Sequence, residues 1–146
     1  MSLFNNIFVV LSFAAEKEQS AYEYYRELAV RMKNPETRRI FEHMAAQERK
    51  HKHRIDTIRR NPALDAKGIK LDTELLPKPE RNVRKSGLAI QNAITLAIQR
   101  EESANKLYTN LAEIVKNPDI QEIFITLARE EAEHKNHLER ILKNIK

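Results

Sequence analysis

Apolar side chains recur every three or four residues along much of the chain, and this period predicts amphipathic α-helices. In the last such segment the recurring positions are Phe124, Leu127, Glu131, His134, Leu138, Ile141 and Ile145. Most of these positions are apolar, which indicates a helix face turned toward a core. Glu131 and His134 stand in the middle of that face, one helical turn apart. Because an unpaired buried carboxylate is costly, this face predicts a compensating partner.

Glycine and proline divide the chain into helical segments. The 2 Gly and 5 Pro residues fall at Asn34-Pro35, at Asn117-Pro118 and within residues 61–87. Each Asn-Pro pair is typical of an N-cap followed by proline at the first helical position. We therefore expect helices at about 4–33, 35–60, 87–116 and 118–145. Two tight turns and a crossover at 61–86 predict an all-α, antiparallel four-helix bundle of two hairpins, with residues 1–146 forming a single domain.

The chain also repeats itself at an offset of 83 residues, with residues 1–60 resembling residues 87–145. No insertion or deletion is needed to align the two halves, which argues against chance agreement. The matched residues include the pairs Glu18 and Glu101, Tyr25 and Tyr108, Glu48 and Glu131, and His51 and His134. We infer that the two hairpins are copies related by a pseudo-twofold axis.

Antiparallel packing places the polar positions of all four helices at one level. Glu18 precedes the Asn34-Pro35 turn by as many residues as His51 follows it, and the second hairpin keeps the same spacing. The centre should then contain Glu18, Glu48, His51, Glu101, Glu131 and His134. These helix faces carry no Lys or Arg, so the carboxylates would repel one another. Two divalent cations would cancel their charge, which predicts a dinuclear metal site with imidazole nitrogens as further ligands.

Composition narrows the chemistry. With no cysteine, the sequence offers only oxygen and nitrogen ligands, which favours iron, manganese or zinc.

The net charge is +5, and the Lys and Arg residues are interspersed among acidic residues, whereas nucleic-acid binders usually concentrate basic residues on one face. The apolar residues 3–15 have no Lys or Arg before them, so we expect the buried start of a helix rather than a signal peptide or membrane span. We therefore expect a cytoplasmic protein that binds neither nucleic acid nor membrane.

The ligand pattern resembles that of the ferritin-like di-iron carboxylate proteins. Within that group the chain most resembles the rubrerythrin type, through Glu18-x-Ser20-Ala21 with Tyr25, Glu48-x-x-His51 and their counterparts in the second half. The resemblance covers essentially the whole chain and implies a ferritin-like fold with two iron ions; manganese, zinc or a mixed pair would suit the same ligands.

The resemblance also implies a role for each ligand. Glu48 and Glu131 would bridge the two irons, and Glu18 and Glu101 would be terminal ligands. His51 and His134 would each bind one iron. The chain departs from the full-length proteins at two points: it lacks the cysteine-ligated rubredoxin domain, and Ala104 stands where they carry a further Glu.

By this resemblance the protein would be a non-haem di-iron oxidoreductase that oxidises a diferrous site with hydrogen peroxide or dioxygen. An external electron-transfer protein such as a rubredoxin would reduce it again, and a homodimer is compatible with the resemblance. One alternative is a ferroxidase that serves iron storage or buffering. Another is a metal-stabilised binding module without turnover.

Several residues near the predicted ligands allow two interpretations. Tyr25 and Tyr108 lie two turns beyond Glu18 and Glu101, where they could bind ligand carboxylates or supply an electron. They could equally be ordinary core residues with a satisfied hydroxyl group. Glu130 and Glu133 lie near enough to orient a histidine or simply face solvent. Outside the ligand faces, His43, His53 and His137 are expected at the surface.

Overall fold

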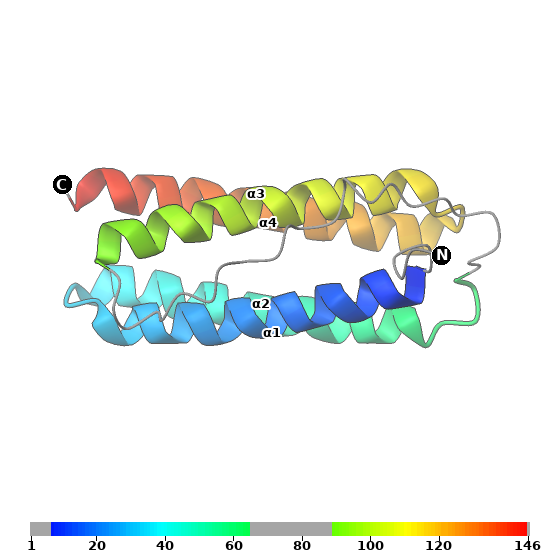
Figure 1. Cartoon of the computed structure of the whole chain (residues 1–146), viewed down its shortest axis with the longest axis horizontal. Helices are drawn as coiled ribbons and strands as arrows, with labels where there is room; N and C mark the ends of the chain where they lie inside the picture. The colour runs from blue at the N-terminus through cyan, green and yellow to red at the C-terminus, as the bar shows by residue number, and fades with distance from the viewer. Residues whose placement is uncertain (1–6, 65–88, 146) are drawn as a thin grey trace.

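The computed structural model describes residues 7–64 and 89–145, and these residues form four α-helices (Figure 1). The helices are α1 (Ile7–Arg31), α2 (Pro35–Arg59), α3 (Ile90–Ile114) and α4 (Pro118–Asn144). The predicted antiparallel bundle of two hairpins is confirmed. The expected helix starts at 4–6 and 87–88, and the predicted crossover beyond residue 64, lie outside the described residues.

An asparagine cap starts the second helix of each hairpin. The Asn34 side chain accepts hydrogen bonds from the backbone amides of Glu36, at 2.8 Å, and Thr37, at 3.4 Å. Asn117 makes the same pair of bonds at the start of α4, at 3.0 and 3.1 Å. Proline follows each asparagine at the first helical position, where its missing N–H has no intrahelical partner to lose. Each of these tight turns reverses the direction of the chain, so the two helices that it joins are antiparallel.

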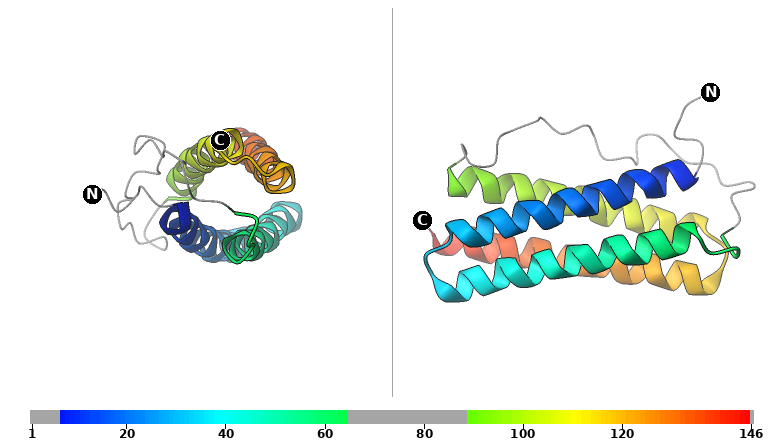
Figure 2. Two further views of the ribbon diagram at one scale, coloured as in Figure 1. Left: turned by 90° about the vertical axis from the view of Figure 1, so that its right-hand side faces the viewer. Right: turned by 90° about the horizontal axis from the view of Figure 1, so that it is seen from below.

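The two hairpins face each other along their length (Figure 2). Within the hairpins, α1 packs against α2 and α3 packs against α4. Between the hairpins, α2 and α4 pack most closely, whereas α1 and α3 approach each other less closely. Groups that link α1 to α3 must therefore use long side chains.

The buried apolar residues form two clusters, one toward each end of the bundle. One contains the start of α1 and the end of α2, including Leu11 and Ile58; the other contains the end of α1 and the start of α2, including Leu28 and Phe41. Ile7 is 1% exposed, so one face of α1 is buried from its first described residue, whereas Phe8 and Val9 are each 38% exposed. The described helices include none long and apolar enough to cross a membrane.

Both caps can be tested by truncation. Asn34→Ala and Asn117→Ala should each lower the free energy of unfolding by about 1 kcal/mol, because two backbone amides lose their acceptor. Urea unfolding followed by circular dichroism measures this change. Asn136→Ala, at an exposed position within α4, is the control and should leave stability unchanged or slightly higher. Equal stability of all three variants and the parent protein would contradict the role of the caps.

Candidate metal centre

The six predicted ligand residues lie together at the middle of the bundle, between the two apolar clusters. Each helix contributes at least one of them, and each is at most 3% exposed. They are Glu18 from α1, Glu48 and His51 from α2, Glu101 from α3, and Glu131 and His134 from α4. These six residues thus form one polar layer in an otherwise apolar core.

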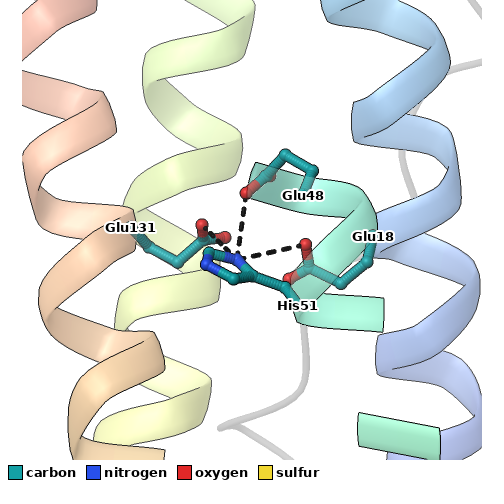
Figure 3. A group of neighbouring side chains, drawn as sticks. All are labelled: Glu18, Glu48, His51 and Glu131. Carbon is teal, nitrogen blue, oxygen red and sulfur yellow. Dashed lines mark ion pairs between the residues drawn. The ribbon is translucent and has the colours of Figure 1, made fainter. Parts of the chain in front are cut away.

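One half of this layer is centred on His51 (Figure 3). Its Nδ1 atom lies 3.1 Å from Oε1 of both Glu48 and Glu131. The same nitrogen lies 3.5 Å from Glu18 Oε2. Four helix-borne side chains therefore direct one atom each toward a common point.

The other half is centred on His134 and repeats this arrangement. Its Nδ1 atom lies 3.2 Å from Glu48 Oε1, 3.4 Å from Glu131 Oε1 and 3.6 Å from Glu101 Oε1. The two imidazole rings stack with their centroids 5.9 Å apart. Glu48 and Glu131 consequently belong to both halves.

The atoms that face the centre have no hydrogen bonds despite these short distances. Each of the six residues contributes one such buried atom: Glu18 Oε2, Glu48 Oε1, His51 Nδ1, Glu101 Oε2, Glu131 Oε1 and His134 Nδ1. Buried polar atoms in proteins are nearly always hydrogen-bonded, and each exception costs about 1–3 kcal/mol. The residues form two overlapping groups whose candidate ligand atoms all lie within 4.8 Å of one another. This donor set fits two metal ions that share Glu48 and Glu131.

Two tyrosines donate hydrogen bonds to the carboxylates of Glu18 and Glu101 across the bundle. The Tyr25 hydroxyl donates to Glu101 Oε1 at 2.5 Å, and the Tyr108 hydroxyl donates to Glu18 Oε1 at 2.5 Å. Each tyrosine therefore binds the carboxylate of the opposite hairpin, and together they link α1 to α3. Both tyrosines are thus buried core residues whose hydroxyl groups contact carboxylates of the predicted ligands.

The outward nitrogen of each histidine has a partner on the opposite hairpin. His51 Nε2 lies 3.3 Å from Glu130 Oε1, and His134 Nε2 lies 2.6 Å from Gln47 Oε1. Glu130 in turn accepts hydrogen bonds from Arg54. Sequence reasoning considered Glu130 but missed Gln47. The 83-residue offset could have found Gln47, because it is the repeat counterpart of Glu130.

The remaining candidates lie away from the cluster. Glu133 is exposed, as are His43 and His53, while His137 is partly buried beside Arg140. Ala104 is partly buried and packs against the apolar cluster that contains Leu11 and Ile58. It therefore adds no carboxylate to the six ligand candidates.

Burial dominates the electrostatics of the four carboxyl groups. It raises the pKa of Glu18 to about 7 and that of Glu101 to about 8, and in both cases the charge of Glu131 adds to the effect. The pKa values of Glu48 and Glu131 are also raised, first by burial and then by neighbouring carboxylates. The cluster thus resists carrying four negative charges when only protein groups balance them.

The histidines respond in the opposite sense. Burial alone would lower their pKa values, but the surrounding carboxylates outweigh it, so that the pKa of His134 rises to about 12 and that of His51 also lies far above its ordinary value. Glu130 lies outside the buried layer, and its contacts with His51 and Arg54 lower its pKa to about 2. At neutral pH Glu130 is therefore a carboxylate.

Comparison with known proteins supports this fold. A family model described as Rubrerythrin matches residues 10–85 and 92–146. A Thermotoga maritima protein described as ferritin-like and diiron-carboxylate superposes with a TM-score of 0.77 over 97% of each chain, at 20% identity. A hypothetical protein from Pyrococcus furiosus superposes with a TM-score of 0.71 over 94% of this chain and 90% of its own, at 23% identity. The expected ferritin-like fold is thus confirmed, and no curated protein matches the sequence significantly.

The stability of the metal-free protein should fall as the pH rises. Because the folded pKa values of Glu18 and Glu101 are raised to about 7 and 8, the folded state binds more protons than the unfolded state between pH 4.5 and those values. The raised histidine pKa values act in the same direction above pH 6.5. We expect the two carboxyl groups alone to cause a loss on the order of 6 kcal/mol between about pH 5 and pH 8, measured by urea unfolding in the presence of a chelator.

A matched variant isolates the carboxyl groups in this experiment. Glu18→Gln combined with Glu101→Gln removes both titrations and should reduce the loss of stability, leaving the part contributed by the histidines, Glu48 and Glu131. A parent protein whose stability rises over the same interval would contradict the assigned electrostatics.

Proposed function

The chain belongs to the rubrerythrin family, as the match over residues 10–85 and 92–146 shows, and on that premise we propose that it is a non-haem dinuclear iron oxidoreductase acting on hydrogen peroxide or dioxygen. The six buried inward-facing atoms without hydrogen bonds are the observation that carries this proposal. Two divalent cations would balance four carboxylates and give each of these atoms a bond. The diiron description of the Thermotoga maritima protein supports iron, although manganese, zinc or a mixed pair suits the same donors.

The proposed ligand roles follow from how the two groups overlap. Glu48 and Glu131 belong to both groups and would bridge the two ions. Glu18 and His51 would complete one ion's ligands, while Glu101 and His134 would complete the other's. Each histidine would bind through Nδ1, because its Nε2 is already engaged by a residue further out.

Two iron ions held by these six residues would supply one electron each to the substrate. Conversion of hydrogen peroxide to two waters takes two electrons and two protons, so one such pair matches one substrate molecule. The tyrosine hydroxyls fix the terminal carboxylates, because Tyr25 binds Glu101 and Tyr108 binds Glu18. Burial raises the pKa values of both tyrosines, which keeps their hydroxyls protonated as donors. Their position also suits them to pass an electron to the centre.

The electrons used in each turnover would come from outside the chain. With no cysteine, the sequence has no iron–sulfur or rubredoxin-type centre of its own. We propose an external electron-transfer protein such as a rubredoxin as the donor.

Peroxide titration tests the proposal. Protein loaded anaerobically with Fe(II) should consume one hydrogen peroxide for every two Fe(II) and develop the near-ultraviolet absorption of an oxidised di-iron site. Glu131→Ala should abolish both, because it removes a ligand shared by both ions. Glu133→Ala, on the exposed side of the same helix, is the control and should behave like the parent. Fe(II) binding with no consumption of either hydrogen peroxide or dioxygen, and without the absorption change, would refute the proposed activity.

A further inference from the structure

The two halves of the centre match in every predicted ligand but differ in the groups behind the histidines. His51 Nε2 faces the carboxylate of Glu130, whereas His134 Nε2 faces the amide oxygen of Gln47. Gln47 and Glu130 occupy equivalent positions of the 83-residue repeat. Behind the histidines the pseudo-twofold symmetry of the centre is therefore broken, because Glu130 and Gln47 differ by one unit of charge.

The groups around this pair differ as well. Glu130 is 16% exposed and both of its oxygens lie 3.2 Å from Arg54 Nη1, which fixes the carboxylate beside His51. The repeat counterpart of Arg54 is His137, whose Nδ1 lies 2.8 Å from Arg140. The two outer contacts thus differ in charge, and only Glu130 is bound by an arginine at the position of Arg54.

A carboxylate behind a metal-bound imidazole strengthens the bond on the other side of the ring. It draws the Nε2 proton toward itself and raises electron density at Nδ1, and outer partners of this kind typically change metal affinity by about 10–100-fold. A neutral amide accepts the same proton with a weaker pull. The Gln47 contact is shorter, at 2.6 Å against 3.3 Å, but a net charge acts over a longer range than an amide dipole. Arg54 offsets part of the Glu130 charge, which places the expected effect near the lower end of that range.

We propose that the two metal positions are unequal, and that the position at His51 binds a divalent cation more tightly and fills first because Glu130 stands behind it. Glu130 is thus a positioning residue that acts through His51. Gln47 is its weaker counterpart behind His134. This inference rests on the proposed dinuclear centre and adds an order of filling to it. At metal concentrations below saturation, one iron position would be filled to a greater extent than the other.

Cobalt(II) provides the test, because it binds oxygen and nitrogen donors and shifts the nuclear magnetic resonance signals of a coordinated imidazole. One equivalent of Co(II) is added to the metal-free full-length protein. The shifted ring-proton signals of His51 should then be about ten times as intense as those of His134. Signals are assigned with His51→Ala and His134→Ala. In a symmetric centre the two histidines would share the first ion equally, so the ratio reports the asymmetry directly.

Swapping the outer residues should move the preference. Glu130→Gln and Gln47→Glu should each bring the ratio close to one, the first by weakening the His51 position and the second by strengthening the His134 position. The double variant should reverse the preference toward His134. Glu133→Gln, which alters an exposed carboxylate nearby, should leave the tenfold ratio unchanged. Because Gln47→Glu keeps Glu130 and Arg54 in place, it tests the inference even if the Glu130 variants do not fold.

Different failures have different meanings. Two bound ions with an even ratio in the parent, or a ratio that the double variant leaves unchanged, would overturn the asymmetry while leaving the dinuclear centre intact. Absence of Co(II) binding in the folded parent would overturn the centre itself and the asymmetry with it.

Discussion

Four carboxylates share one buried level of the bundle, and the rest of the structure depends on how their charge is balanced. Glu18, Glu48, Glu101 and Glu131 are each at most 3% exposed, so water cannot screen their repulsion. The two histidines supply the nearest positive groups, yet the atoms facing the centre still have no hydrogen bonds. A pair of metal ions would supply both the positive charge and the missing bonds. The apolar clusters at either end of the bundle would then hold the ligands of the metal centre in place.

The internal repeat explains how so few residues build this centre. One hairpin supplies a Glu from its first helix and a Glu-x-x-His pair from its second, and the pseudo-twofold copy supplies the rest. Residues of opposite hairpins then hold one another. Tyr25 and Tyr108 span the wider separation between α1 and α3, while Gln47 and Glu130 contact the histidines across the closer pair, α2 and α4.

The sequence predicted much of this arrangement because its strongest signals are periodic. The helices, the Asn-Pro caps and the level shared by the six polar residues follow from spacing alone. Contacts across the hairpins could not be read in the same way, since they depend on how the two hairpins are offset and rotated. Spacing along one helix could not show that Tyr25 binds Glu101 rather than a carboxylate of its own hairpin. Gln47 was missed because an amide on a helix next to a ligand ordinarily faces solvent.

The central claim is that the six inward-facing atoms are metal ligands, and anomalous diffraction from crystals soaked anaerobically in Fe(II) tests it most directly. The account predicts two anomalous peaks about 3.5–4 Å apart in the middle of the bundle, with Glu48 and Glu131 contacting both and one histidine Nδ1 at each. A well-ordered bundle without peaks at this level, or with iron bound only at surface residues, would contradict it.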